Sequence, residues 1–341
     1  MVDLRAGFAL TLLAAANLTA CLENRALTGE SYTGPLLVRT GPTEACVVQG
    51  GAARLKAVVT DLNGNPYTAE SISWSTSDAR VAQVSGGVVT GIGPGNAVIT
   101  AGVRGWFGHS SLWVRRGFVS FVIDDGHSSD WSMKRPIFEE KGAVASVAIV
   151  SGWSGVRQTS DSELRSLVNL GWEVLAHSRT HIPEDTLNVG QLKSQIQGAQ
   201  EDLAARGFST RIHVYPYGAH STTTEMVVRE NFDAALTAGG GFNRLPITDW
   251  FAIRRINLGT AYARPGQNTL AFYKGLVDST RIGGHWLIFM IHELASVDSA
   301  NLRAVLDYSH NLGLPILTVS QGLAQAHVAP PMACAPGSLT N

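Results

Sequence analysis

The sequence predicts two domains: a small all-β sandwich over residues 36–115 and an α/β barrel over residues 117–325. Up to about residue 115, apolar and polar residues alternate with a period near two. Beyond residue 117, apolar strand segments alternate with helical ones. The 341-residue chain is 45% hydrophobic and 16% charged, which is too apolar for a disordered protein.

The charge and cysteine content exclude several classes of protein. Lys+Arg 26 against Asp+Glu 27 gives a net charge of −1, so we expect no nucleic-acid partner and no polybasic contact with anionic lipid. Three cysteines are too few for a disulfide framework or a cysteine-based zinc module.

Residues 1–20 are predicted to be an export signal. The apolar run 6–16 follows Arg5 and is shorter than the roughly 20 residues of a spanning helix. The segment Leu18-Thr19-Ala20-Cys21 follows it and resembles the lipobox of bacterial lipoproteins, in which Cys21 would be lipidated and become the first mature residue. A signal cleaved without lipidation and a short buried segment are the alternatives.

The resemblance to lipoproteins implies a location. We expect an exported monomer, tied to the cell envelope by a lipid, with residues 21–35 as a tether. By the same resemblance, Leu22 after the cysteine favours the outer membrane if the cell is Gram-negative. Export places Cys46 and Cys334 in an oxidising compartment, where they could pair or stay free.

The pattern of the first domain is that of short strands with regular turns. Leu55, Ala57 and Val59 alternate with polar residues, and Asn63-Gly64-Asn65-Pro66 has turn chemistry. Residues 36–103 resemble a bacterial immunoglobulin-like domain of group 2. The matching segments are Trp74-Ser75-Thr76-Ser77-Asp78, Val81-Ala82, Gly87-Val88-Val89-Thr90-Gly91 and Pro94-Gly95-Asn96-Ala97-Val98-Ile99-Thr100. A spacer role is favoured over adhesion or glycan contact.

The second domain is predicted to be a distorted (β/α)7–8 barrel, followed by a C-terminal tail over 326–341. The predicted strands are 118–123, 143–150, 172–176, 211–215, 234–237, 252–258, 286–291 and 314–319. The predicted helices are 131–141, 161–169, 189–206, 222–231, 269–282 and 299–311. Such alternation gives a parallel sheet, whose active site forms at the carboxyl ends of the strands.

Polar clusters follow three of these strands. They are Asp124-Asp125-Gly126-His127, His177-Ser178-Arg179-Thr180-His181 and His292-Glu293. Adjacent aspartates at a strand end point in different directions, so one can bind a metal and the other can accept a proton. Two histidines with one carboxylate are a common catalytic metal site. Each cluster alone is more typical of a solvated loop, and their shared position favours the metal site.

Four motifs in order resemble the polysaccharide deacetylase family, also called the NodB-homology domain or carbohydrate esterase family 4. They are Phe121-Val122-Ile123-Asp124-Asp125-Gly126, His177-Ser178-Arg179-Thr180-His181, Tyr215-Pro216-Tyr217-Gly218 and Ile288-Phe289-Met290-Ile291-His292. The resemblance covers residues 117–325. It implies a metal-dependent hydrolase that removes N-acetyl groups from an N-acetylglucosamine-containing polysaccharide at the cell surface. An O-acetyl polysaccharide esterase and a non-catalytic glycan-binding surface protein are the alternatives.

The same resemblance implies a role for each matching residue. Asp125, His177 and His181 would hold a divalent metal ion, usually zinc. Asp124 would be the general base and His292 the general acid. The motif of Pro216 and Tyr217 would bind substrate, and the Tyr217 N–H would stabilise the oxyanion.

One position in the third motif differs from the family pattern. The third motif often carries an arginine that orients the base, and this chain has Val214 there. Asp249-Trp250 could be a remnant of the fourth motif. Arg254 or Arg255 could replace the missing guanidinium, or both could lie on the surface. Strand alternation sends one of the two inward, and Arg255 is the preferred candidate.

Overall fold

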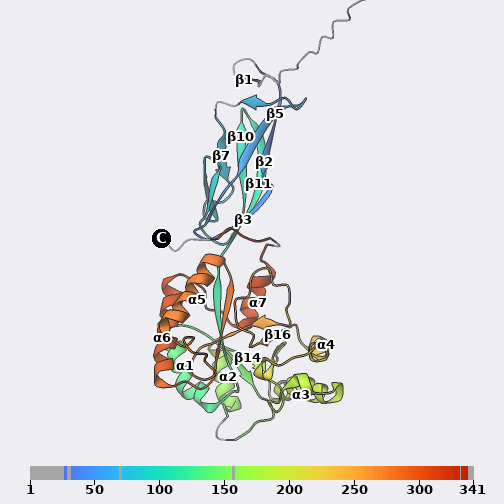
Figure 1. Cartoon of the computed structure of the whole chain (residues 1–341), viewed down its shortest axis with the longest axis vertical. Helices are drawn as coiled ribbons and strands as arrows, with labels where there is room; N and C mark the ends of the chain where they lie inside the picture. The colour runs from blue at the N-terminus through green and yellow to red at the C-terminus, as the bar shows by residue number, and fades with distance from the viewer. Residues whose placement is uncertain (1–26, 29–31, 69–70, 156–157, 331, 337–341) are drawn as a thin grey trace, which may run out of the picture.

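A computed structural model describes residues 27–28, 32–68, 71–155, 158–330 and 332–336. It shows an elongated molecule in which an all-β part and an α/β part follow one another along the long axis (Figure 1). The predicted signal and Cys21 lie outside the described residues. Within the described ranges, no helix is long and apolar enough to cross a membrane.

The N-terminal part is built from short strands, all-β as predicted. Its bounds are β1 (Leu27–Thr28), β2 (Leu36–Gly41), β3 (Glu44–Val48), β4 (Ala52–Arg54), β5 (Lys56–Asp61), β6 (Tyr67–Thr68), β7 (Ser73–Thr76), β8 (Ala82–Ser85), β9 (Val88–Gly91), β10 (Gly95–Val103) and β11 (Trp106–Arg115). The largest sheet has the order β3-β11-β10-β7, and a three-stranded sheet has the order β4-β9-β8. Alternate apolar residues of these two sheets, among them Val89 and Leu112, form one core together with Leu55, which lies between β4 and β5. The immunoglobulin-like assignment itself stays a prediction.

The C-terminal part is a parallel eight-stranded sheet with the order β17-β16-β15-β14-β13-β12-β19-β18. Its strands are β12 (Phe118–Ile123), β13 (Ser146–Ile149), β14 (Glu173–Ala176), β15 (Ile212–Val214), β16 (Ala234–Thr237), β17 (Ile253–Arg254), β18 (Ile256–Asn257) and β19 (Trp286–Ile291). Only Arg255 separates β17 from β18. Because β17 pairs with β16 and β18 pairs with β19, this one segment nearly closes the sheet into a barrel.

Helices cover the outside of this sheet (Figure 1). They are α1 (Arg135–Glu140), α2 (Asp161–Asn169), α3 (Val189–Ala205), α4 (Thr222–Asn231), α5 (Leu270–Gly283), α6 (Ser296–Asn311) and α7 (Val319–His327). Helices α2, α3 and α4 begin at Ser160, Asn188 and Ser221, whose side chains accept hydrogen bonds from backbone N–H groups of the first turn.

Two predicted elements need correction. The predicted strand 314–319 is wrong: it makes a single bridge, from Ile316 to Val119, and Thr318 caps α7 by accepting a hydrogen bond from the Gln321 N–H. The predicted helix 131–141 is two elements, a π-helical turn over Asp130–Lys134 followed by α1, which has Pro136 in its first turn.

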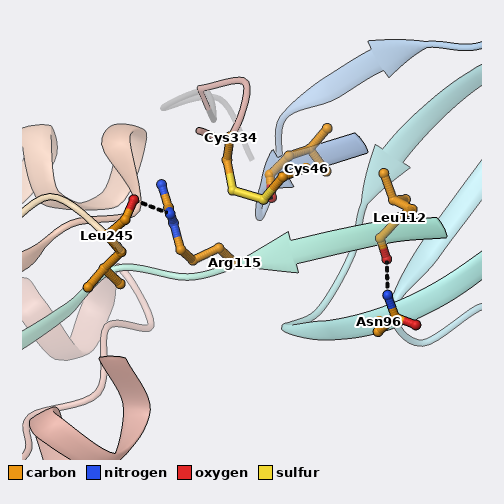
Figure 2. Close-up of a disulfide and its surroundings, with 7 residues drawn as sticks. Cys46, Asn96, Leu112, Arg115, Leu245 and Cys334 are labelled. Carbon is orange, nitrogen blue, oxygen red and sulfur yellow. Dashed lines mark hydrogen bonds between the residues drawn. A yellow bond between two sulfur atoms is a disulfide. The ribbon is translucent and has the colours of Figure 1, made fainter. Parts of the chain in front are cut away.

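The two parts are joined at three places. Only residues 116–117 separate β11 from β12. Cys46 and Cys334 form a disulfide with a Cα–Cα distance of 4.4 Å (Figure 2), and Ala335 pairs with Val47 beside it. Arg115, which is 8% exposed, donates from Nη1 to the Leu245 carbonyl at 2.7 Å (Figure 2). The orientation of the first domain on the barrel is therefore fixed by covalent and polar contacts.

We expect the substitution Cys334→Ser to lower the free energy of unfolding by about 2–4 kcal/mol, because the crosslink restricts the unfolded chain. Urea unfolding under non-reducing conditions measures this. Cys46→Ser should have the same effect, and the double variant should lose no more than either single one. Additive losses would show that the two cysteines act separately.

Candidate active site

The two adjacent carboxylates come from the end of β12, whose residues are all buried. Asp124 is 2% exposed, and its N–H donates to the Ile291 carbonyl of β19. Asp125 follows with φ 77°, a left-handed conformation that turns the chain out of the strand. The two side chains therefore face different partners.

A carboxylate and two imidazoles meet beside β12. The ligand atoms of Asp125, His177 and His181 all lie within 4.8 Å of one another. Oδ1 of Asp125 is 3.6 Å from Nε2 of His177 and 3.3 Å from Nε2 of His181. The Nδ1–H of His177 donates to the Val214 carbonyl at 2.7 Å, which leaves Nε2 of that ring with a free lone pair.

The electrostatics of this cluster fit a divalent cation. Oδ1 of Asp125 is buried and has no hydrogen-bond partner among the described residues. Burial opposes ionisation of Asp125, but the neighbouring His127 and His177 imidazoles hold the pKa of Asp125 well below its usual range. Burial also opposes a charge on His177, but Asp125 and Asp124 outweigh burial and raise the pKa of His177. Burial, followed by His177, lowers the pKa of His181 to about 4. The cluster thus favours one positive charge and keeps a neutral imidazole available as a ligand.

Asp124 is held by a buried ion pair. Nη1 of Arg255 donates to Oδ1 of Asp124 at 2.6 Å, and the side chains are 1% and 3% exposed. Burial opposes ionisation of Asp124, but Arg255, His177 and His292 together outweigh burial and lower the pKa of Asp124. The neighbouring Arg254 is exposed. Arg255, which lies between β17 and β18, therefore supplies a guanidinium to Asp124, although position 214 holds a valine.

His292 lies on the other side of Asp124, directly after β19. Its Nε2 is 3.7 Å from Oδ2 of Asp124, and its Nδ1 is buried without a hydrogen-bond partner among the described residues. Burial lowers the pKa of His292. The imidazole is therefore poised to exchange protons close to Asp124.

Tyr217 lies at the mouth of the site. It has a left-handed backbone, with φ 60° and ψ 5°, and its ring is 63% exposed and 4.7 Å from that of His181. Pro216 before it is buried and fixes the start of this turn.

A cavity of about 480 Å³ collects nearly all of the predicted site residues. Its lining includes Asp124, Asp125, His177, His181, Arg255, His292 and Tyr217. Pro216 is buried next to Tyr217 in the chain and does not line the cavity. Asp249 lies on the surface, 3.6 Å from Arg229, so the proposed remnant of the fourth motif does not reach this site.

Sequence reasoning missed two contributions to the site. His127 belongs to the first polar cluster of the sequence, but its contact with Asp125 was not predicted. Its Nε2 lies 3.4 Å from Oδ2 of Asp125, the carboxylate oxygen that His177 and His181 do not face. Tyr262 and Arg264 line the cavity from the segment after β18. The only feature of the sequence that points to Tyr262 and Arg264 is that both follow the end of a predicted strand.

Comparisons with known proteins agree with the geometry. Residues 114–232 match the family model described as polysaccharide deacetylase. The match supports a polysaccharide deacetylase domain in this part of the chain. No curated protein matches the sequence.

Several solved structures are similar to the chain. A family 4 carbohydrate esterase from Streptomyces lividans has 20% identity and a TM-score of 0.44, with 59% of this chain and 91% of that chain covered. A CE4 domain of a multidomain xylanase from the hindgut metagenome of Trinervitermes trinervoides has 16% identity and a TM-score of 0.46, covering 64% and 95%. A peptidoglycan deacetylase from Bacillus subtilis has 16% identity and a TM-score of 0.45, covering 62% and 92%.

We expect Arg255→Gln to lower the free energy of unfolding by about 3–5 kcal/mol, because it leaves the buried Asp124 carboxylate without its partner. Arg255→Lys should recover part of the loss, since the charge is kept. The matched control is the exposed neighbour Arg254→Gln, which should change stability by less than about 0.5 kcal/mol. Equal losses for Arg254 and Arg255, measured by urea unfolding, would contradict the assigned pairing.

Removal of one ligand should weaken metal binding. We expect His181→Ala to lower the affinity for zinc by more than about 100-fold, since even an outer contact of a metal ligand is worth 10- to 100-fold. Competition with a chromophoric chelator measures this without any substrate. His310→Ala is the control, because His310 is exposed on α6. Unchanged affinity in the His181 variant would place the ion elsewhere.

Proposed function

We propose that this chain is a metal-dependent hydrolase that removes N-acetyl groups from an N-acetylglucosamine-containing polysaccharide at the cell surface. The observation that carries the proposal is the convergence of a carboxylate, two imidazoles and the Asp124–Arg255 pair on one cavity. The polysaccharide deacetylase match over residues 114–232 supports an acetylated glycan as the substrate class.

The metal would be held by Asp125, His177 and His181, whose donor set suits zinc. A divalent ion bound there polarises an acyl oxygen and makes a water molecule more acidic. The protein keeps two nitrogens and one carboxylate oxygen oriented toward it. His127 and the Val214 carbonyl hold these ligands in position.

Asp124 is proposed as the general base. Arg255 occupies its Oδ1, so Oδ2 is the oxygen left to accept a proton from the attacking water. Because Arg255, with His177 and His292, keeps the carboxylate ionised, the base would be ready before substrate binds. Without this pair, a buried carboxyl would favour its neutral form and could not act as a base.

Two further groups are proposed to complete the reaction. The N–H of Tyr217 would donate to the oxyanion that develops on the acyl group. His292 would protonate the leaving nitrogen. Its Nε2 lies 3.7 Å from Oδ2 of Asp124, too far for a direct hydrogen bond, so the proton taken from the attacking water would reach His292 through a solvent molecule. The products are acetic acid, which ionises to acetate in solution, and a free amine, so no net proton is left on the protein.

We further propose that the chain is exported and held at the cell envelope through a lipid on Cys21. The Cys46–Cys334 disulfide supports an oxidising compartment. The tether over residues 21–35 and the first domain would then separate the barrel from the membrane.

Acetate release from N-acetylglucosamine oligomers by the zinc-loaded protein tests the activity. We expect Asp124→Asn to lower kcat by at least about 100-fold, because it removes the general base. Asp249→Asn, an exposed aspartate outside the cavity, should leave kcat unchanged.

The substrate panel separates the alternatives. Release from ester-acetylated xylan but not from amides would establish an O-acetyl esterase in place of the proposed N-deacetylase. Binding of oligomers without any acetate release would instead establish a glycan-binding protein.

A further inference from the structure

One wall of the cavity comes from a segment that no catalytic motif includes. Residues 258–269, here named the rim loop, connect β18 to α5, and Tyr262, Arg264 and Gln267 of this loop line the cavity. The loop lies outside the residues that match the deacetylase family model. We therefore consider the side chains of the rim loop as a substrate-recognition feature of this chain, apart from the matched family segment.

The first residues of the rim loop are hydrogen-bonded to the barrel. The Gly259 N–H donates to the Tyr273 hydroxyl at 2.9 Å, and the Thr260 hydroxyl donates to Oδ2 of Asp298 at 2.7 Å. Asp298 is fully buried on α6. These bonds hold the start of the loop in one place, so the side chains at its tip are presented in a defined position.

Tyr262 projects from this tip toward solvent. Its ring is 75% exposed, and it meets the His292 ring edge to face, with the centroids 4.8 Å apart. Its backbone is left-handed, with φ 61°, a conformation that costs a non-glycine residue about 1 kcal/mol or more. A strained, exposed aromatic ring beside the proposed acid offers an apolar face to a sugar next to the leaving nitrogen.

Arg264 carries the charge in the cavity that the protein does not balance. The acidic residues in the lining are Asp124 and Asp125, and the arginines are Arg255 and Arg264. Asp124 is neutralised by Arg255, and Asp125 faces the proposed cation. Arg264 is exposed and forms no ion pair with any residue that the structure describes. With a divalent ion in place, the cavity is positive on the rim-loop side.

We propose that the rim loop binds a carboxylate-bearing sugar adjoining the acetylated one, with Arg264 pairing with the carboxylate and Tyr262 packing on the ring. This inference rests on the proposed deacetylase function and narrows its substrate to an acidic glycan. The carboxylate can belong to a uronic acid or to a lactyl ether on the sugar. Both present the same planar anion to the guanidinium.

The test compares each acidic substrate with its carboxyl-reduced form. One pair is an oligomer of alternating N-acetylglucosamine and glucuronate; the other is a peptidoglycan strand with a free lactyl group. We expect kcat/KM to be about three- to fivefold higher for at least one acidic form, as an exposed ion pair supplies. The preference should shrink at 1 M salt. The substrate set in which the acidic form is preferred identifies whether the carboxylate comes from a uronic acid or from a lactyl ether.

Substitutions assign the preference to residues. Arg264→Ala should abolish the preference for the acidic form, and Arg264→Lys should keep most of it. Tyr262→Ala should lower kcat/KM on the acidic and reduced forms alike, and Tyr262→Phe should retain it. Arg39→Ala, which removes an exposed arginine of β2, should leave both rates and the preference unchanged. An equal preference in the wild-type and Arg264→Ala proteins overturns the inference.

Binding separates this inference from the proposed function. Titration calorimetry with the Asp124→Asn protein measures affinity for intact acidic and carboxyl-reduced oligomers when no turnover occurs. Tighter binding of an acidic form that disappears in the Asp124→Asn/Arg264→Ala double variant supports the rim-loop site even if no acetate is released. Equal affinity for both forms overturns the site, whereas efficient turnover of both leaves the deacetylase function standing.

Discussion

The buried ion pair between Asp124 and Arg255 links the closure of the barrel to the chemistry of the site. Arg255 is the single residue between β17 and β18, so its backbone lies where the sheet closes while its side chain enters the barrel. Each charge would cost several kcal/mol to bury alone, and each is stabilised by the other. The segment β17–Arg255–β18 pairs with β16 on one side and β19 on the other. It must therefore place the guanidinium of Arg255 close to Asp124 at the end of β12. The segment that nearly closes the barrel thus also carries the partner of Asp124, the proposed base.

The metal-ligand side of the cavity depends on backbone conformation more than on packing. Asp125, Ser178, His181 and Tyr217 all have φ between 58° and 77°, in the left-handed region. Such residues persist only where surrounding bonds fix them, and here the His181 N–H donates to Oγ of Ser178 while the His177 ring donates to the Val214 carbonyl. The strain gathers at the carboxyl ends of the strands, where side chains must turn back across the barrel mouth. A rigid sheet supports the strained turns.

The sequence predicts best those strands whose bounds depend on neighbouring residues alone. Strands β12, β16 and β19 match their predicted bounds because β12 and β19 are largely apolar runs followed by polar residues, and β16 is followed by a run of glycines. Strand alternation predicted that only one of Arg254 and Arg255 points inward; Arg255 was the preferred candidate, and the structure buries it. The segment 314–319 reads as a strand, but strand pairing is set by distant partners, and the cap at Thr318 prevails locally. The Cys46–Cys334 pairing and the position of the rim loop depend on contacts between elements far apart in sequence, which no local pattern contains.

The attachment of the two domains also bears on the role of the first one. Strand β12 begins two residues after the first domain ends, and it runs for six residues, roughly 20 Å, before Asp124. The cavity therefore opens at the end of the barrel away from the N-terminal strands, and Figure 1 shows the two parts in that linear order. With the disulfide and Arg115 fixing the junction, the first domain cannot fold back over the cavity without breaking these contacts. This geometry favours a rigid spacer, which holds the cavity away from the point where the chain would be anchored, over a module that contacts the glycan at the site.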